Sequence, residues 1–347
     1  MKFVNIINDD KFTADYINFV EDNLDMSEQV FFVFKTHDKF PIKERSNIFS
    51  YDKNKHNYFD YLVFLKNLVK HGIKAEKIII HGLFKIKITQ ILWVLRFLLP
   101  KCYWAVWGGD LYSRDENLLT RRGRYKEFFR KKVIKDMGYI ITSIKGDYEN
   151  VVKWYGTKAP HLPYFMYPAS LYHDIPIADK KDNKLNILVG NSADPTNNHE
   201  EAFAKIAPFV NENVRVICPL NYGSKKHASA MVDLGNKMFG SSFEPILDYI
   251  KYDEYMSLLT TVDIAVFNHN RQQAMSTTRV LLGMGKTVYL RKETSSFETL
   301  EALGAKVSSI DDFSLEIDAM SGIESASAIK EYYSEQNLVN NLNVIFS

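Results

Sequence analysis

Short apolar runs alternate with longer amphipathic segments along most of this chain, and this alternation limits the fold more than any other feature of the sequence. Runs such as 2–7 (KFVNII) and 77–82 (KIIIHG) are rich in β-branched residues and have the length of strands. The segments 12–24 and 56–71 that follow strand-like runs have the spacing of helices. Strands that alternate with helices favour a parallel sheet, so the sequence predicts an α/β fold.

The alternation is interrupted around residues 160–183, where four prolines precede a polar stretch. This composition is typical of a linker between domains. A chain of 347 residues also suits two domains better than one core. We therefore predict an N-terminal Rossmann-like domain over 1–165, a linker over 166–184 and a second Rossmann-like domain over 185–347. Two doubly wound domains would place a ligand-binding cleft at the carboxyl ends of their strands.

Charge and composition exclude several classes of protein. The formal net charge of +2 gives no signal of nucleic-acid binding for the molecule as a whole. Cys102 and Cys218 lie in separate apolar runs, which favours two buried thiols and leaves a disulfide as the alternative. The most apolar segment, 88–100, is shorter than the roughly 20 residues that a membrane span needs, and it contains Arg96. No leader-peptide pattern is present, so we expect a cytoplasmic protein.

Polar residues follow two strands of the second half. The apolar run from Leu185 ends in a Gly-Asn-Ser turn, and the run 263–268 leads through a polar loop into a hydroxyl-rich helix start. Backbone N–H groups and helix dipoles at such turns can bind a diphosphate. Ordinary turn and cap chemistry is the alternative, and it explains the first turn better than the second loop. The candidate donor-binding residues are Gly190, Asn191, Ser192, Asn270, Arg271, Gln272, Ser276, Thr277 and Thr278.

Polar residues also end two strands of the first half. His81 closes one run, and Asp110 follows another directly after Gly108 and Gly109. Asp110 either caps the next helix or acts in the cleft, and His81 is either structural or functional. Motifs of zinc and serine hydrolases are absent, as are Asp-x-Asp pairs that would hold a metal and a diphosphate.

A long helix is expected from about 117 to 135, and its segment 121–135 contains eight basic residues and one acid, with aromatic residues between them. A basic, aromatic, amphipathic helix favours contact with an anionic membrane surface, and a solvated helix face is the alternative. The apolar helix over 88–99 could lie beside it. The candidate membrane contacts are Arg121, Arg122, Arg124, Lys126, Arg130, Lys131 and Lys132.

Several motifs resemble the glycosyltransferase family 56 enzymes. These are HGLF, AVWGGDLY, ILVGNSADPTNNHEEAF and VICPLNYG, with the Arg-Gln-Gln loop and the hydroxyl-rich helix that follows it. The resemblance runs in order from about residue 76 to 304, whereas the first 75 residues match poorly. Members of this family transfer 4-acetamido-4,6-dideoxygalactose to a lipid-linked disaccharide in enterobacterial common antigen assembly.

The resemblance implies a GT-B architecture, in which two Rossmann-like domains face each other across a cleft. It implies an acceptor bound mostly by the first domain and a nucleotide-sugar donor bound mostly by the second. GT-B enzymes generally need no metal or other cofactor, which agrees with the missing Asp-x-Asp pairs. The implied donor residues are Asn191, Ser192, Tyr222 and 270–278. The implied acceptor-side residues are His81, Trp107, Gly108, Gly109 and Asp110. Of these, Asp110 and His81 are the candidate catalytic groups.

The function implied is transfer of a deoxy-amino sugar from a dTDP-sugar to a lipid-linked saccharide in bacterial surface polysaccharide synthesis. The implied location is the cytoplasmic face of the inner membrane, with an anionic membrane surface as a further partner and no nucleic acid. One alternative is a GT-B transferase with another donor and acceptor, such as capsule, O-antigen or protein. The others are a non-catalytic nucleotide-sugar-binding protein and an epimerase of the same architecture, for which the sequence offers no clear set of acidic residues.

Overall fold

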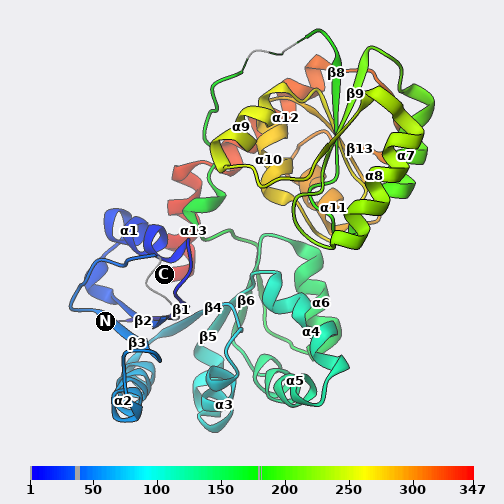
Figure 1. Ribbon diagram of the computed structural model, residues 1–347. Coiled ribbons are helices and arrows are strands. Elements are labelled where there is room, and N and C mark those ends of the chain that lie inside the picture. The colour runs from blue at the N-terminus through cyan, green and yellow to red at the C-terminus, as the bar shows by residue number, and fades with distance from the viewer. Residues whose placement is uncertain (1, 36–39, 179, 181) are drawn as a thin grey trace. The chain divides into compact units, whose positions relative to one another are not determined.

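The structure is a computed structural model that describes residues 2–35, 40–178, 180 and 182–347. It divides into two compact units, drawn in Figure 1. The N-terminal unit comprises Met1–Leu171 together with Glu335–Ser347, and the C-terminal unit comprises Tyr172–Ser334. Each unit is an α/β domain built on one parallel sheet, as the alternation of strands and helices predicts.

The last helix corrects the predicted domain boundaries. Residues 335–347 were assigned to the second domain, but α13 (Glu335–Phe346) packs on the N-terminal unit. The Phe346 ring lies 5.1 Å from the Phe3 ring, and Asn341 Nδ2 donates to the Phe165 carbonyl at 3.3 Å. The apolar side of α13 is therefore buried against the first sheet, a contact between chain ends that a pattern along the sequence does not reveal.

The N-terminal sheet has seven parallel strands in the order β3-β2-β1-β4-β5-β6-β7. Strand β2, which lies between the edge strand β3 and β1, is almost wholly buried, in agreement with its continuous apolar sequence QVFFVF. The chain reverses its direction of strand addition between β1 and β4. The strands are β1 (Phe3–Asn8), β2 (Gln29–Lys35), β3 (Ile48–Asp52), β4 (Lys77–His81), β5 (Cys102–Ala105), β6 (Tyr139–Ile141) and β7 (His161–Leu162).

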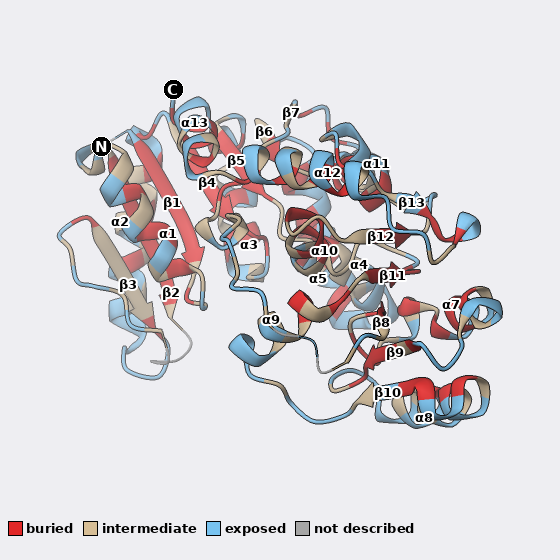
Figure 2. Ribbon diagram, turned by 90° about the horizontal axis from the view of Figure 1, so that it is seen from above, coloured by how far each residue is buried: buried red, intermediate tan, exposed pale blue. Residues whose placement is uncertain are grey.

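Helices cover both faces of this sheet. Figure 1 shows α2, α3 and α5 on one face and α1 and α13 on the other, and Figure 2 shows the buried strands between them in red. Side chains from α2, α3 and α5 form one core with β1, β2, β4 and β5. The helices are α1 (Thr13–Asn23), α2 (Tyr58–Lys74), α3 (Ile86–Val94), α4 (Gly109–Leu119), α5 (Arg121–Ile134), α6 (Lys145–Tyr155) and α13.

The expected long helix over about 117–135 is two helices. Thr120 has an extended backbone, with φ −119° and ψ 152°, and its side chain accepts a hydrogen bond from the Gly123 N–H. A threonine in this position ends α4 and caps the start of α5. The helix expected over 88–99 likewise ends early, at Val94, because a short 3₁₀ segment that contains Pro100 follows it.

The C-terminal sheet has six parallel strands in the order β10-β9-β8-β11-β12-β13. Its direction of strand addition reverses between β8 and β11. The elements are β8 (Leu185–Val189), α7 (His199–Ile206), β9 (Val214–Pro219), α8 (Lys225–Phe239), β10 (Phe243–Ile246), α9 (Tyr252–Thr261), β11 (Ile264–Phe267), α10 (Met275–Gly283), β12 (Thr287–Leu290), α11 (Ser295–Ala302), β13 (Ser308–Ser309) and α12 (Ala319–Tyr332).

Each sheet thus has one point where strand addition changes direction, and ligands of open α/β sheets bind outside the carboxyl ends of strands at such a point. In the C-terminal unit the loops there begin at Gly190, after β8, and at Asn268, after β11. In the N-terminal unit they begin at Asp9, after β1, and at Gly82, after β4. Most of the strand-end residues chosen from the sequence lie in or beside these loops.

Candidate functional site

In the C-terminal unit, the loops after β8 and β11 are joined by several hydrogen bonds, and the Asn197 side chain lies at the centre of one group of them. The Asn197 side-chain oxygen accepts a hydrogen bond from the Asn191 N–H at 2.9 Å and lies 3.0 Å from His269 Nε2. Gly190 has φ +68°, and a Cβ there would lie 2.7 Å from His199 Nε2 and 2.8 Å from Asn197 Oδ1. Only glycine allows the loops to approach this closely.

The residues after β8 also meet the loop after β9. Asn191 Nδ2 donates to the Tyr222 hydroxyl at 2.8 Å, and Asn197 Nδ2 donates to the Ser192 hydroxyl at 3.3 Å. The Tyr222 residue is 58% exposed, so its ring is accessible to a ligand, whereas Ser192 is buried. The structure therefore brings four predicted donor-site residues together, namely Gly190, Asn191, Ser192 and Tyr222.

The polar loop after β11 lies against the same turn. The Asn270 N–H donates to the Thr196 carbonyl at 2.9 Å. The Arg271 guanidinium is 3.6 Å from the Asp194 carboxylate, and its side chain is 39% exposed, so it remains available to a second anion. Gln272 contributes its carbonyl oxygen, which lies 3.5 Å from Arg271 Nη1.

The hydroxyl-rich start of α10 is only partly suited to a ligand. Ser276 is exposed, and the Thr277 hydroxyl lies 3.2 Å from the Tyr255 hydroxyl. Thr278 is fully buried, and its hydroxyl donates to the Ala274 carbonyl at 3.0 Å. The prediction that Thr278 contacts the donor is therefore not supported, because its hydroxyl is turned back onto its own helix.

Three histidines of this region were not among the predicted site residues. His269 is buried beside Asn197, and His199 Nδ1 lies 3.1 Å from His227 Nε2 at the start of α8. Burial lowers the pKa of His269 to about 3 and that of His199 to about 4. Both rings are therefore neutral at pH 7. The NNH sequence at 197–199 was the one available signal, but nothing in the sequence shows that a separate helix supplies the partner histidine.

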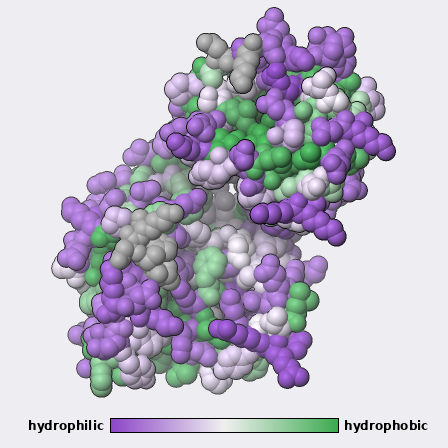
Figure 3. Space-filling model, viewed as in Figure 1, coloured by the Kyte–Doolittle hydropathy of each residue, from purple (hydrophilic) through white to green (hydrophobic). Residues whose placement is uncertain are grey.

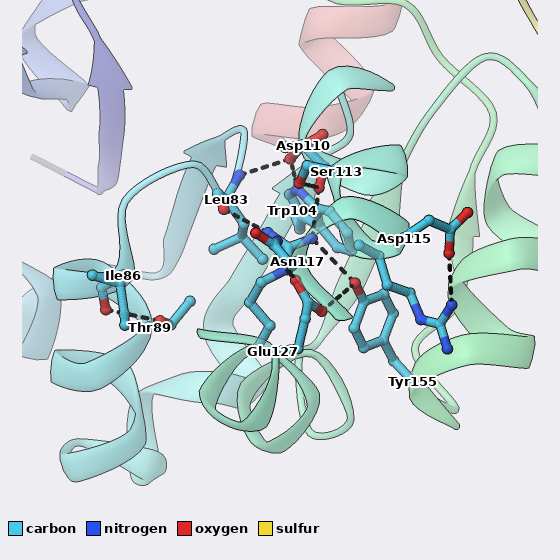
Figure 4. Close-up of polar contacts among 12 residues, drawn as sticks. Leu83, Ile86, Thr89, Trp104, Asp110, Ser113, Asp115, Asn117, Glu127 and Tyr155 are labelled. Carbon is cyan, nitrogen blue, oxygen red and sulfur yellow. Dashed lines mark hydrogen bonds and ion pairs between the residues drawn. The ribbon is translucent and has the colours of Figure 1, made fainter. Parts of the chain in front are cut away.

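Asp110 in the N-terminal unit is a buried carboxylate that accepts hydrogen bonds from three N–H groups. It is 0% exposed. Its Oδ2 accepts hydrogen bonds from the Leu83 N–H and the Trp104 indole N–H, both at 2.7 Å (Figure 4). Its Oδ1 accepts from the Trp107 N–H at 3.0 Å. This geometry supports neither of the two predicted roles. Its oxygens are occupied, which disfavours a role as a base, and its partners lie outside α4, so it does not cap that helix.

A second buried charge lies beside Asp110. Arg130 is 0% exposed; its guanidinium donates to the Asp110 carbonyl at 2.9 Å and forms an ion pair with Glu127 at 3.0 Å. The Tyr155 hydroxyl donates to Glu127 Oε2 at 3.0 Å (Figure 4). The prediction that Arg130 contacts a membrane is therefore wrong, because its guanidinium is buried and paired with Glu127 inside the unit. Lys126 is only half-buried and stays near the surface.

His81 is the centre of a chain of hydrogen bonds. The Trp107 indole N–H donates to the Tyr167 hydroxyl at 2.7 Å, and that hydroxyl lies 2.7 Å from His81 Nδ1. His81 Nε2 lies 3.1 Å from Asn5 Oδ1, and Asn5 Nδ2 donates to Gln29 at 2.9 Å. Burial lowers the pKa of His81 to about 3. A neutral ring with both nitrogens engaged orients Tyr167 and Trp107, and the geometry disfavours His81 as a base.

The acceptor-side residues lie at the carboxyl edge of the N-terminal sheet. Gly108 has φ +67°, Gly109 is exposed at the start of α4, and the half-buried Trp107 ring lies 5.8 Å from the Phe12 ring. Asp10 follows β1 at this edge and is half-exposed. Its Oδ1 accepts from the Phe12 N–H at 2.8 Å, and Oδ2 has no partner among the described residues. Asp10 was not among the predicted site residues, because it stands in an ordinary helix-start pattern.

The face formed by α3 and α5 combines apolar and basic side chains. The two helices are in contact, and Figure 1 shows them side by side. Apolar patches interrupt the hydrophilic surface of this unit in Figure 3. Exposed apolar residues here are Trp93, Val94, Phe97, Tyr125 and Phe128, and exposed basic residues of the predicted set are Arg121, Arg122, Arg124, Lys131 and Lys132.

Two kinds of feature are absent from the described residues. No described helix combines the length and the apolar composition needed to cross a membrane. Within the same residues, no group of three or more His, Cys, Asp or Glu side chains is placed to hold a metal ion.

Comparisons with known proteins agree with this geometry. Similar structures include the N-terminal domain of Candida albicans trehalose-6-phosphate phosphatase, with 11% identity, TM-score 0.63 and coverage of 99% of this chain and 96% of that chain. Anabaena HepE in complex with UDP and glucose has 11% identity, TM-score 0.62 and coverage of 100% and 98%. An E. coli trehalose-6-phosphate structure bound with UDP-2-fluoro glucose has 9% identity, TM-score 0.63 and coverage of 100% and 98%. At such low sequence identities, the structural similarity shows the fold alone, and this fold is GT-B.

The sequence itself establishes the family. A family model described as 4-alpha-L-fucosyltransferase, glycosyl transferase group 56, matches residues 17–308. The match includes both loops of the candidate donor site and the strand ends that carry His81 and Asp110. The resemblance drawn from the motifs is thereby confirmed, and the chain belongs to glycosyltransferase family 56.

Proposed function

We propose that this glycosyltransferase moves a deoxy-amino sugar of the 4-acetamido-4,6-dideoxygalactose type from a dTDP-sugar to a lipid-linked saccharide in bacterial surface polysaccharide synthesis. The family match carries the proposal. The joined loops after β8 and β11 support it, because they bring asparagine amides and the Arg271 guanidinium together at a strand-order reversal, next to the Tyr222 ring.

The chemistry of transfer assigns different tasks to the two units. The acceptor hydroxyl attacks the anomeric carbon, the bond to the diphosphate breaks, and its electron pair leaves with the nucleoside diphosphate. Arg271 and the start of α10 would stabilise this growing negative charge without a metal. Asp10 replaces Asp110 as our candidate for receiving the hydroxyl proton, because its Oδ2 is uncommitted while Oδ1 is held by the Phe12 N–H.

The donor assignment is tested by a thermal-shift panel of dTDP, UDP and GDP, followed by transfer assays with the matching nucleotide-sugars. A ligand that binds only the folded state raises the melting temperature, so dTDP should give the largest shift. Arg271→Ala should reduce that shift, and Lys237→Ala, which changes an exposed cation on α8, should not. A larger shift with UDP or GDP would reassign the nucleotide. Turnover abolished by EDTA and restored by Mg²⁺ would contradict the metal-free reaction.

We further propose that the α3–α5 face rests on the anionic cytoplasmic surface of the inner membrane, where a lipid-linked acceptor is found. Exposed aromatic and basic side chains on one face fit such a surface. Each basic residue near it contributes about 1 kcal/mol. Changing Arg121, Arg122, Lys131 and Lys132 to Gln should therefore sharply reduce sedimentation with phosphatidylglycerol-containing vesicles.

The matched control changes four exposed lysines elsewhere, Lys153, Lys158, Lys237 and Lys292, to Gln. The control should sediment like the wild type, and both variants should keep the dTDP-induced thermal shift. Equal loss of sedimentation in the two variants would show that vesicle binding depends on the net charge of the protein. It would contradict the proposal that the α3–α5 face contacts the membrane.

A further inference from the structure

His199 is a buried histidine with one ring nitrogen unsatisfied. The residue is 0% exposed, and its Nδ1 lies 3.1 Å from His227 Nε2. Its Nε2 has no hydrogen-bond partner among the described residues. A buried polar group without a partner is costly, and such groups are concentrated at functional sites. His199 is therefore placed there for a reason other than the stability of the unit.

The surroundings of His199 are strained and contain further unsatisfied groups. Within the described chain, the non-glycine residues with positive φ are Asn198 and Ala274, and they directly precede α7 and α10. Backbone strain of this kind persists where the fold must hold a functional geometry. Asn191 Oδ1 and Asn268 Oδ1 are also buried without partners. All these groups lie in the loops after β8 and β11 or at the start of the helix that follows, at one edge of the sheet.

The charges around the pair decide where an added proton would reside. Burial, followed by the nearby His227, lowers the pKa of His199 to about 4, so His199 stays neutral near pH 7. His227 is half-buried in the first turn of α8, where its ring borders the surface. A charge on the half-buried ring remains in contact with solvent, whereas a charge on the buried His199 ring would be desolvated. A proton taken up by the pair is therefore placed on His227.

We propose that nucleoside diphosphate binding is coupled to proton uptake by the His199–His227 pair, in which His227 faces the diphosphate and His199 positions its ring. The proposal rests on the proposed function, since it needs a nucleotide at this edge. The proton comes from solvent. It binds the His227 ring, whose Nε2–H then donates to His199 Nδ1, while His199 carries its own proton on the unsatisfied Nε2.

The sign of the coupling follows from linkage. Negative charge beside His227 raises the pKa of its ring in the complex, so the complex binds more protons than the free protein. The affinity for the nucleotide must therefore rise as pH falls through the neutral range. One proton limits the change to at most about tenfold per pH unit.

Other charged and titratable groups also lie near the pair. Lys225 and Lys226 on α8 and Arg271 after β11 are cations, and His269 stays neutral because burial lowers its pKa to about 3. The pKa of Asp194 is lowered, because hydrogen bonds from Thr196 outweigh the opposing effect of burial. Glu200, beside His199 on α7, is an exposed carboxylate.

The experiment is calorimetric titration with dTDP at pH 7 in two buffers of different ionisation enthalpy, which measures protons taken up on binding. His227→Gln keeps an amide at the Nε2 position but cannot be protonated. We expect the wild type to take up more protons than His227→Gln, by up to one per nucleotide. Protons released by the dTDP phosphate itself cancel in this difference. His173→Gln, at an exposed position of the same unit, should match the wild type.

The pH dependence gives a second readout. The affinity of His227→Gln should be lower than wild type by about five- to twenty-fold at pH 6.5, and the difference should shrink at pH 8. Equal proton uptake and a constant affinity ratio, with dTDP still bound, would overturn the proton coupling while leaving the donor site intact. Absence of binding by dTDP, UDP and GDP to the wild type would overturn the donor site and this proposal together.

Discussion

Replacing Asp110 by Asn tests whether this carboxylate supports the fold or the chemistry. In the wild type, three N–H groups donate to it, two at Oδ2 and one at Oδ1. An asparagine must place its NH₂ group on one side. The less damaging orientation puts it at the Oδ1 position, where it meets the Trp107 N–H and leaves that donor buried and unpaired. The remaining oxygen keeps the Leu83 and Trp104 bonds, now to a neutral acceptor.

The size of the effect follows from these changes. Leaving one buried donor unpaired costs about 1–3 kcal/mol, and a hydrogen bond to a charged acceptor exceeds a neutral one by about 1 kcal/mol. Relief of the buried charge offsets part of this sum. We expect Asp110→Asn to lower the free energy of unfolding of the N-terminal unit by about 3 kcal/mol. For a unit of this size, that corresponds to roughly 6–12 °C in melting temperature.

Tryptophan fluorescence measures this unit selectively, because Trp93, Trp104, Trp107 and Trp154 are the four tryptophans of the chain and all belong to it. The matched control is Asp115→Asn on the same helix. Asp115 is 68% exposed and pairs with Arg114, and an exposed pair contributes little. If Asp110→Asn were as stable as Asp115→Asn and its turnover were a hundredfold lower than that of the wild type, the structural role would be refuted. Asp110 would then again be the candidate catalytic group.

Three further predictions concern other positions. Asp10→Asn should lower turnover by roughly 10²–10⁴ with unchanged dTDP affinity, because the amide still accepts from the Phe12 N–H but cannot receive a proton; near-wild-type turnover contradicts this. Burial raises the pKa of Asp147 from 3.8 to about 6. The contribution of this residue to the free energy of unfolding is therefore fully present below about pH 4 and is lost as pH rises through 6. In urea unfolding, Asp147→Asn should gain stability relative to wild type at pH 7.5 and not at pH 4, and a pH-independent difference contradicts it. Gly190→Ala should abolish the dTDP-induced thermal shift, because its Cβ would meet His199, whereas Gly156→Ala, with the same φ of +68° and open space around it, should keep the shift.

The sequence was sufficient to locate the ends of strands, and with them most of the residues at both edges. Gly190, Asn191 and Ser192 directly follow β8, and Asn270 and Arg271 follow β11 closely. A parallel sheet brings such positions to one edge, so their proximity could be inferred without a structure. The family resemblance added Tyr222, whose link to Asn191 depends on a contact between separate loops.

The sequence could not show which polar side chains are already satisfied. Asp110 and Asp10 both follow strands and both stand near a helix start, so their local patterns are alike. They differ in their contacts with distant residues. The Leu83 N–H donates a hydrogen bond to Asp110 Oδ2, whereas no described residue donates one to Asp10 Oδ2. The same limit applies to His81, because its partners Asn5 and Tyr167 come from strands and loops far along the chain.

The basic helix α5 shows how one composition serves two purposes. Gly123, Glu127, Arg130 and Ile134 are buried and recur at intervals of three or four residues, which places them on one side of the helix. Glu127 and Arg130 neutralise each other there, and Arg130 also donates to the Asp110 and Leu83 carbonyls, so this side fixes α5 to the loops after β4 and β5. Because those contacts fix the rotation of α5, Arg121, Arg124, Tyr125, Phe128, Lys131 and Lys132 are held on the surface. The buried arginine thus orients the very face that we propose rests on the membrane, and a variant that loses Arg130 should lose vesicle binding through disorder of α5 rather than through its charge.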